Sequence, residues 1–505
     1  MAVSRRGGVV FSYLHLTAEV VSSLLFTPYL IRSLGQAEWG LYSLVASVTA
    51  YFLLLDAGVG NALVRYIAKF RVTGDSRQQQ RLLGISLVFY TGVGVVVLLL
   101  GLVLRQNLPA IFGGGLTPSE LARAGIMLNI TLWNAAATLI FSAFDRVVVA
   151  YERFVLSKSL AIARLVVRVM TLTALLTLGY RAVAVVSANL ALTVVFGLIT
   201  TAFVLFRLNL RPAWRGLQFG FLREVIGYTS FIFLQMIATQ VNAMSDQVLL
   251  GIMTTSATVG VYAVGAQLST YFQSIAGSIN GVLMPGVVRL VETGASSESL
   301  LAEMVKVGRL VFMVLGLLLG GFLVVGEQFV IVWAGAENAD GYWVALILMS
   351  AMILYLTQAI GSQILWAMGR HKVQAILNVG VALANIGLTV VLIKWNPLIG
   401  ASLGTAVAIL IGNVAVMNIV FTKDIGVSMW QYYAGLFRGI LPSLVLAVLA
   451  GLVVRLGGLS GVSGLVVGGL AILLVYGAAM IAFGLNNYEK GLLAPILRRT
   501  LPWGR

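Results

Sequence analysis

Charged side chains within long apolar stretches are the residues of this sequence that could do chemistry. Glu19 and His15 stand four residues apart in one stretch, so a helix would place them on one face. A carboxylate beside a histidine in apolar surroundings is a candidate proton relay, or a neutral hydrogen-bonded pair that only orders its helix. Each such charge requires a reason, because a charged group at the centre of a bilayer costs a few kcal/mol.

A second pair, Arg164 and Arg168, shows the same spacing in another apolar stretch. Arg164 is close enough to the end of that stretch to reach water, whereas Arg168 lies about 15 Å from it at 1.5 Å per residue. Guanidinium groups bind phosphate oxygens in pairs, so we expect both arginines to line a cavity for a phosphate-bearing or acidic substrate. The alternative is a structural ion pair, with Glu19 as a candidate partner.

Two aspartates complete the set of charged candidates. Asp246 stands among amides that include Gln240 and Asn242. We expect this polar helix face to line the outer half of the cavity, or to hydrogen-bond a neighbouring helix. Asp56 ends an apolar stretch and is expected to pair with Arg65 or a nearby arginine, as a gate or, preferably, as a structural anchor.

Aromatic and amide side chains in the same stretches are candidates for sugar recognition. Rings stack on the apolar faces of sugars and amides bond to hydroxyls, although both also serve helix packing. The cavity residues assigned on these grounds are Tyr42, Tyr262, Asn129, Asn134, Gln240, Asn242, Gln267, Asn280 and Gln358. Ion coupling is assigned to His15, Glu19 and Asp246.

No motif typical of an enzyme accompanies these residues. The sequence lacks a Walker A motif, a Gly-rich dinucleotide loop, HExxH and GxSxG. Its 505 residues include no Cys and two His, which argues against disulfides, iron–sulfur clusters and a structural zinc site. We therefore expect neither catalysis nor a bound metal or cofactor. A proton or sodium gradient is the candidate driving force.

The composition is that of a membrane protein. Hydrophobic residues make up 60% of the chain and charged residues 10%, and the mean hydropathy is +0.99. We predict an all-α polytopic membrane protein of about 14 transmembrane helices, with a kink near Pro285 in a long window. The apolar windows fall near residues 8–31, 39–60, 82–104, 122–144, 159–178, 182–206, 225–250, 258–288, 307–326, 342–367, 373–393, 399–421, 434–454 and 462–484.

Positive charge is distributed unevenly between the loops. With the N-terminus inside, twenty-four of the 33 Lys and Arg residues fall on the inner side, six on the outer side, and three in or beside spans. The positive-inside rule places the first side in the cytoplasm, so both termini are expected there. The same rule accounts for the net charge of +16 without a nucleic-acid partner.

An internal repeat divides the chain. Residues 40–52 recur at 260–272 with five of thirteen positions identical, including Gly40/Gly260 and Tyr42/Tyr262. The intervening six predicted helices give both copies the same orientation, as in secondary transporters whose halves rock around a shared site. We predict two six-helix bundles that face each other across a water-accessible cleft. The predicted parts are an N-terminal lobe (1–207), an amphipathic cytoplasmic linker (208–223), a C-terminal lobe (224–422), two extra helices (423–485) and a cytoplasmic tail (486–505).

The sequence resembles the polysaccharide transporter (oligosaccharide and O-antigen flippase) branch of the multidrug/oligosaccharidyl-lipid/polysaccharide exporter superfamily. The runs that carry the resemblance are Thr27-Pro-Tyr-Leu-Ile-Arg-Ser-Leu-Gly-Gln-Ala-Glu-Trp-Gly-Leu-Tyr-Ser-Leu44, Leu55-Asp-Ala-Gly58, Arg65-Tyr-Ile-Ala68, Asp246-Gln-Val-Leu-Leu-Gly251 and Val259-Gly-Val-Tyr-Ala263. The resemblance implies a flippase of the bacterial inner membrane that moves undecaprenyl-pyrophosphate-linked oligosaccharides to the periplasmic leaflet by ion-coupled alternating access. It implies that lipid-linked substrate, the lipid bilayer and polysaccharide polymerase machinery are partners.

Other functions remain open at this point. A drug or cation antiporter of the same superfamily would share the fold, although the runs above favour the polysaccharide branch. A membrane glycosyltransferase or polysaccharide polymerase needs acidic residues in a sizeable external loop, and the longest external loops here are short, at 105–121 and 327–341. The lipid II flippase branch has arginines on helices 1 and 8 of its cavity. This sequence has Glu19 in its first predicted helix and no arginine well inside its eighth, which disfavours that branch.

Overall fold

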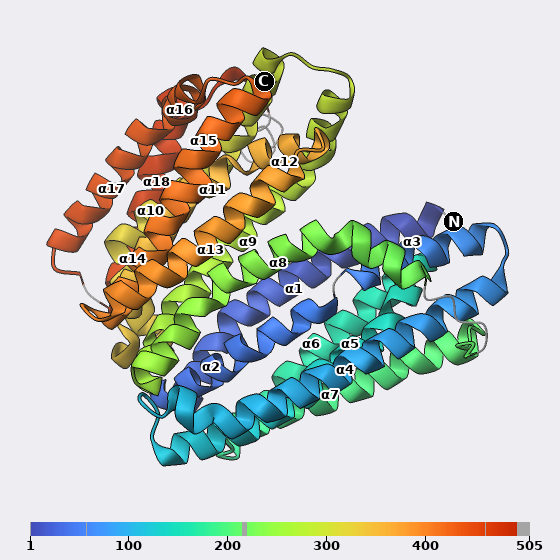
Figure 1. The fold of residues 1–505 in the computed structure, drawn as a ribbon. Coiled ribbons are helices and arrows are strands. Elements are labelled where there is room, and N and C mark those ends of the chain that lie inside the picture. Colours follow the sequence, from blue (N-terminus) through green and yellow to red (C-terminus); the bar gives the residue numbers. More distant parts are fainter. Residues whose placement is uncertain (1, 57, 215–219, 460, 492–505) are drawn as a thin grey trace. The chain divides into compact units, whose positions relative to one another are not determined.

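Long apolar runs fold into helices because a bilayer offers no partner for free backbone groups. A computed structural model describes residues 2–56, 58–214, 220–459 and 461–491, and these residues form helices and no β-strand (Figure 1). The predicted all-α class is confirmed. The helices are α1 (Ala2–Leu34), α2 (Gln36–Leu53), α3 (Val59–Val72), α4 (Ser76–Phe112), α5 (Pro118–Ala150), α6 (Phe154–Thr177), α7 (Ala182–Ala202), α8 (Gly220–Met253), α9 (Ser256–Glu292), α10 (Ser297–Ala334), α11 (Gly341–Thr357), α12 (Ala359–Ala367), α13 (His371–Ile393), α14 (Pro397–Ala408), α15 (Met417–Val420), α16 (Met429–Phe437), α17 (Ile440–Leu456) and α18 (Gly461–Ala479).

Many of these helices have the length and composition of membrane spans. Within the described part of the chain, nine stretches are long and apolar enough to cross a bilayer, or up to twelve if each of three bent helix pairs is one span. The predicted windows 8–31 and 225–250 fall on α1 and α8, which stand outside that count. The protein is therefore a multi-pass membrane protein.

The predicted kink is present in α9, whose axis bends by 49° between Gly281 and Leu283. Pro285 has no N–H to donate to the carbonyl of Gly281, so the helix loses a hydrogen bond at the bend. Two further spans bend, by 41° between α11 and α12 and by 44° between α16 and α17. Gly439 joins the second pair at φ 77°, a conformation that favours glycine.

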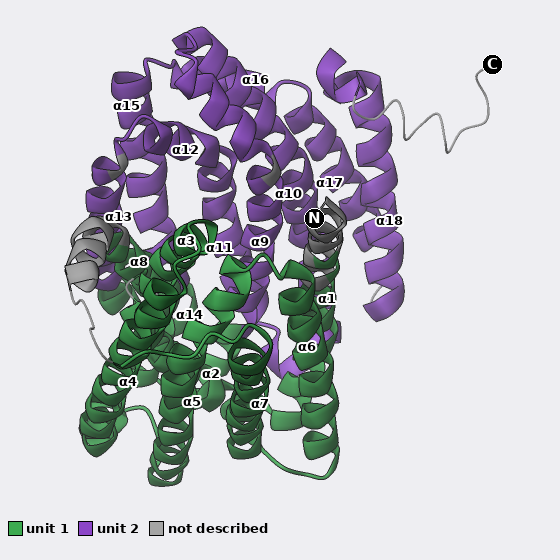
Figure 2. Cartoon of the chain, turned by 90° about the vertical axis from the view of Figure 1, so that its right-hand side faces the viewer, with its two compact units in different colours: residues 1–263, 389–401 green, residues 264–388, 402–505 purple. Residues whose placement is uncertain are grey.

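The chain forms two compact units, coloured separately in Figure 2: residues 1–263 with 389–401, and residues 264–388 with 402–505. In the first unit α5 packs against both α4 and α7, and α6 packs against α1 and α7 (Figure 1). In the second unit α10 packs against α11, α16, α17 and α18. The core of each unit is therefore built around one long helix, α5 or α10.

The predicted lobe boundaries stay a prediction. Residues 208–214, where the linker was expected to begin, form no regular helix. The N–H of Ala213 donates to the carbonyl of Gln80 at 2.9 Å, which holds this segment against α4. Residues 215–219 of the expected linker and residues 492–505 of the expected tail lie outside the described residues.

The two copies of the repeat begin with glycines that lie against each other. A Cβ on Gly40 of α2 would overlap the backbone carbonyl of Ser256, and one on Gly260 of α9 would overlap that of Gln36. Small residues allow helix backbones to approach closely in membranes. The glycines therefore permit α2 and the first turns of α9 to cross in backbone contact.

Polar contacts of α5 reinforce this corner of the first unit. The Thr117 side chain and Glu120 form a capping box that starts α5. Glu120 also accepts a hydrogen bond from Ser256 of α9, and Arg123 pairs with Glu38 of α2. The beginnings of α2, α5 and α9 are thus joined by charged groups at one end of the unit.

A buried ion pair holds the end of the chain to the second unit. Arg309 of α10 and Glu489 are 4% and 2% exposed, and they form two hydrogen bonds of 2.6 and 3.0 Å. Arg309 also donates to the carbonyls of Gly435 and Arg438, which have no helical partner where α16 ends. The Arg309 guanidinium therefore supplies donors for the carbonyls at the end of α16, and its ion pair with Glu489 anchors the segment that follows α18.

Candidate functional site

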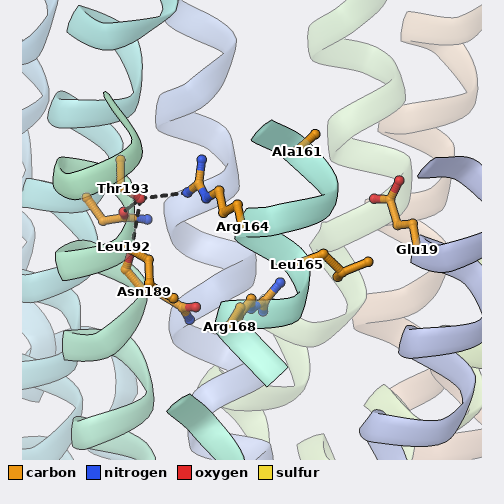
Figure 3. A pocket seen from close by; sticks show the side chains of 9 residues that line it. Glu19, Ala161, Arg164, Leu165, Arg168, Asn189, Leu192 and Thr193 are labelled. Carbon is orange, nitrogen blue, oxygen red and sulfur yellow. Dashed lines mark hydrogen bonds between the residues drawn. The ribbon is translucent and has the colours of Figure 1, made fainter. Parts of the chain in front are cut away.

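A polar cavity of about 420 Å³ lies among α1, α5, α6 and α7 of the first unit (Figure 3). We name it the arginine cavity after Arg164 and Arg168, which both line it from α6. Glu19 enters from α1 and Asn134 from α5. The structure therefore brings together four residues that the sequence assigned to the site.

Arg164 is held in place by a hydrogen-bond network over three helices. Its Nη2 donates to Oγ1 of Thr193 on α7 at 2.8 Å. That hydroxyl lies 2.5 Å from Oδ1 of Asn134 and 2.9 Å from the carbonyl of Asn189, and it has one proton to donate to either. Thr193 is 3% exposed, so the network stands at the base of the cavity and orients the guanidinium.

Arg168 lies one helical turn further along α6 and has a different environment. Its side chain is exposed, and it forms no hydrogen bond or ion pair with any residue that the structure describes. Figure 3 shows Arg168 extending from α6 and Glu19 from α1. Among the described residues, the charged groups of the cavity are two guanidiniums and one carboxylate, so their sum is positive. No described residue occupies any of the five N–H donors of Arg168, which can therefore bind an anion.

A second cavity, of about 230 Å³, adjoins the first in the same unit. The two share Ala161, Arg164 and Thr193 as lining residues. Asp145 of α5 lines the second cavity together with Arg164 of α6 and Thr200 of α7. We name it the hydroxyl cavity, because Thr138, Ser157, Thr193 and Thr200 all line it.

Sequence reasoning missed Asp145, Asn189 and Thr193. The predicted window ended at residue 144, whereas α5 continues to Ala150 and keeps Asp145 within the helix. Asn189 and Thr193 carry no charge and gave no hydropathy signal, but their four-residue spacing places both on one helix face. That spacing was the signal available in the sequence.

Asp246 belongs to a separate buried cluster of the first unit. It is 2% exposed, and it accepts hydrogen bonds from Oη of Tyr262 at 2.5 Å and from Oγ1 of Thr389 at 3.2 Å. The three side chains come from α8, α9 and α13. Asp246 therefore joins three helices, and it lines neither the arginine cavity nor the hydroxyl cavity.

Asp56 has a tyrosine as its hydrogen-bond partner. Oη of Tyr90 on α4 donates to Asp56 at 2.5 Å, and no ion pair joins Asp56 to Arg65 among the described residues. The guanidinium of Arg65 lies over the ring of Tyr66, 6.0 Å from its centroid. The hydrogen bond from the neutral hydroxyl of Tyr90 to Asp56 thus links the end of α2 to α4.

The other predicted residues whose side chains the structure describes line neither cavity. Gln358 is 2% exposed in the second unit and donates to the carbonyl of Asn413 at 2.6 Å. Tyr42 stacks on Trp39 with centroids 5.7 Å apart. His15 belongs to α1 but its side chain lies outside the described part. The half-buried members of the set are Asn129, Gln240, Asn242, Gln267 and Asn280.

No metal centre emerges from the described residues, in which no group of three or more His, Cys, Asp or Glu side chains comes together. The chemistry that the described side chains of the arginine cavity support is the non-covalent binding of an anion by guanidinium groups.

Solved structures that share this fold include a lipid II flippase and multidrug transporters. Lipid II flippase MurJ in an inward closed conformation has a TM-score of 0.71 at 12% identity, over 97% of this chain and 99% of that chain. An inward-facing multidrug resistance MATE family transporter of the MOP superfamily has a TM-score of 0.57 at 16% identity, over 80% and 96%. A point mutant of the MATE transporter VcmN of Vibrio cholerae has a TM-score of 0.55 at 15% identity, over 84% and 97%. At these identities the similarity establishes the fold alone.

The sequence itself assigns the family. The profile of a family described as polysaccharide biosynthesis protein matches residues 6–291, more than half of the chain. This protein therefore belongs to the polysaccharide biosynthesis protein family, and the resemblance seen in its sequence runs is confirmed. No curated protein matches the sequence significantly.

Proposed function

We propose that this protein is a flippase that moves polyprenyl-pyrophosphate-linked oligosaccharides from the cytoplasmic to the periplasmic leaflet of the bacterial inner membrane. Membership of the polysaccharide biosynthesis protein family supports a lipid-linked sugar as the substrate. The fold, shared with a lipid II flippase and multidrug transporters, supports translocation as the activity. The observation that carries the proposal is the arginine cavity, with Arg168 available to a ligand.

The physical problem of such a flippase is the pyrophosphate. Its negative charges must pass through about 30 Å of hydrocarbon, in which an unpaired charge is very unfavourable. Arg168 supplies a permanent positive charge and a planar fork of donors that matches phosphate oxygens. An arginine within a span costs about 2.5–3.5 kcal/mol on insertion scales. The binding of an anionic headgroup would explain why an arginine is placed there despite this cost.

Glu19 gives the cavity a group that a proton or another cation can neutralise. When Glu19 is ionised, it offsets one of the two arginines, and when it is neutralised the positive charge of the cavity rises. Ion binding would then favour the state that holds the pyrophosphate. Glu19, His15 and Asp246 are the proposed coupling groups, with a proton or sodium gradient as the driving force and no bound cofactor.

The asymmetry of loop charge supports the proposed orientation. Both termini would lie in the cytoplasm, together with the turn between α5 and α6 near the hydroxyl cavity. The substrate would therefore load from the side on which lipid-linked sugars are assembled. Polysaccharide polymerase machinery would receive it in the periplasm.

Replacement of Arg168 tests the proposal. Arg168→Ala should slow translocation of a labelled lipid-linked oligosaccharide in proteoliposomes by about 10- to 100-fold, the loss expected for one charged hydrogen-bonding group. Arg168→Lys keeps the positive charge but lacks the planar fork of donors. Its translocation rate should therefore lie between those of wild type and Arg168→Ala. Arg77→Ala, at an exposed arginine of α4, is the matched control. A wild-type rate for properly inserted Arg168→Ala would contradict the proposal.

A drug or cation antiporter is the second candidate, because MATE transporters share the fold. The positive sum of charges in the arginine cavity opposes a cationic drug, which favours the flippase. Ion-driven export of a cationic dye, without exchange of lipid-linked oligosaccharide between leaflets, would favour the antiporter.

A further inference from the structure

The hydroxyl cavity has the chemistry of a pocket for one sugar. Its volume of about 230 Å³ is below the roughly 300–1,000 Å³ of pockets for drug-sized ligands, and it suits a single ring. The lining groups that bear on this are the hydroxyls of Thr138, Ser157 and Thr200, the carboxylate of Asp145, and the rings of Phe141 and Phe196.

These groups match the two kinds of surface that a sugar presents. Sugar hydroxyls both donate and accept, as do Thr and Ser hydroxyls, and a carboxylate such as Asp145 accepts from several donors. The apolar C–H faces of the ring pack on aromatic side chains. Phe141 is positioned for this by Gly197, where a Cβ would overlap its ring. Because Gly197 has no side chain, the phenyl ring can pack against α7 at the cavity wall.

The two cavities are arranged in series along α6. Ser157 lines only the hydroxyl cavity, Arg164 lines both, and Arg168 lines only the arginine cavity. These positions extend over about 16 Å of helix at 1.5 Å per residue. The passage from one cavity to the other is therefore marked by the guanidinium of Arg164.

The covalent structure of the proposed substrate has the same order. In a polyprenyl-pyrophosphate-linked oligosaccharide the first sugar is bonded directly to the pyrophosphate. A pyrophosphate bound by Arg168 and Arg164 would therefore place that sugar in the site next to Arg164. The hydroxyl cavity occupies that site.

We propose that the hydroxyl cavity binds the first sugar of the lipid-linked substrate while the arginine cavity binds its pyrophosphate. This inference rests on the proposed function, and it assigns selectivity for the first sugar to the hydroxyl cavity. Asp145 accepts hydrogen bonds from the sugar hydroxyls, and Thr138 adds a hydroxyl from the same helix. Sugars beyond the first stay outside this pocket, so variation in the rest of the glycan is tolerated.

The test compares two lipids that differ by one sugar. The full-length protein in nanodiscs is titrated with polyprenyl pyrophosphate alone, and with polyprenyl pyrophosphate bearing one glucose or one N-acetylglucosamine. Wild type should bind at least one sugar-bearing lipid more tightly than the bare lipid. Asp145→Asn should weaken that binding by about tenfold, the usual effect of a hydrogen bond to a charged group. Asp145→Asn should bind the bare lipid equally well or better, because a negative charge near the anion is removed.

Thr138→Val provides a second variant that leaves all charges in place. It should weaken binding of the sugar-bearing lipid alone, whereas Arg168→Ala should weaken binding of both lipids. Thr177→Val is the matched control, since the hydroxyls of Thr138 and Thr177 both donate to a carbonyl of their own helix and Thr177 lines neither cavity. Thermal melting of each variant reports whether it is folded.

The outcomes separate the two proposals. If wild type binds the bare and sugar-bearing lipids equally, or if folded Asp145→Asn and Thr138→Val bind the sugar-bearing lipid as wild type does, the sugar pocket is overturned and the flippase proposal stands. If wild type binds neither lipid, the proposed function fails and the sugar pocket fails with it.

Discussion

Tyr42 and Tyr262 occupy the same position in the two copies of the repeat, yet their hydroxyls have different surroundings. Oη of Tyr262 donates to the buried carboxylate of Asp246 at 2.5 Å. The hydroxyl of Tyr42 forms no hydrogen bond within the described part of the chain, and its ring stacks on Trp39. Because a hydrogen bond to a buried charged group contributes about 1.5–3 kcal/mol, the two tyrosines differ in importance for stability.

Removal of each hydroxyl tests this difference. Tyr262→Phe should lower the thermal unfolding temperature in detergent, because Asp246 would lose a buried hydrogen-bond donor. Tyr42→Phe removes the same atom from the equivalent position and should leave the unfolding temperature close to that of wild type. Equal melting of the two variants would show that the Tyr262–Asp246 bond contributes nothing to stability.

At the scale of helices, α2 and α9 cross where each copy of the repeat begins. Gly40 and Gly260 leave no room for a side chain on either helix. Nearby, Glu38 pairs with Arg123 and Glu120 accepts from Ser256. The two helix backbones are in contact at the crossing, and the charged groups beside it add further bonds between the helices. We therefore expect α2 and the first turns of α9 to move together as one rigid unit.

A single methyl group tests the crossing. Gly40→Ala would place a Cβ on the carbonyl of Ser256, and overpacking of this kind costs about 1–3 kcal/mol. We expect a lower unfolding temperature and a lower yield of folded protein. Gly277→Ala is the control, since a Cβ at this position in α9 meets no atom within 4 Å. Melting of Gly40→Ala at the temperature of the control would show that the helices separate at no cost.

At the scale of the whole molecule, the chain combines two helical units with a strongly asymmetric distribution of loop charge. Most of the 33 Lys and Arg residues fall on one predicted side, and the net charge is +16. Anionic lipids of the cytoplasmic leaflet attract such loops. The proposed direction of transport, with loading from the cytoplasm, depends on this orientation.

The absence of cysteine from the sequence allows a direct test of orientation. Single cysteines are introduced at Thr73, between α3 and α4, and at Gly114, between α4 and α5; both positions are exposed. In intact spheroplasts an impermeant maleimide should label Gly114→Cys and leave Thr73→Cys unlabelled until the membrane is opened. The reverse pattern would invert the topology and, with it, the direction proposed for transport.

Much of the architecture could be predicted from the sequence, because hydropathy is a sum over one helix at a time. The windows located most spans, and Pro285 marked the bend of α9. Sequence runs identified the family, since short motifs such as Leu55-Asp-Ala-Gly58 are local too. The four-residue spacing of Arg164 and Arg168 predicts one shared helix face from helical geometry alone, and both arginines line the arginine cavity.

The partners of these residues were decided by tertiary structure. Thr193 holds Arg164, and Tyr90 bonds to Asp56. Asp145 belongs to a cavity wall because α5 continues past the predicted window. The residues of each pair lie on different helices, and their contact depends on how helix faces pack. Hydropathy does not describe how helix faces pack. The sequence by itself therefore determined a helical membrane protein of this family. Tertiary contacts alone decided which polar side chains share a cavity.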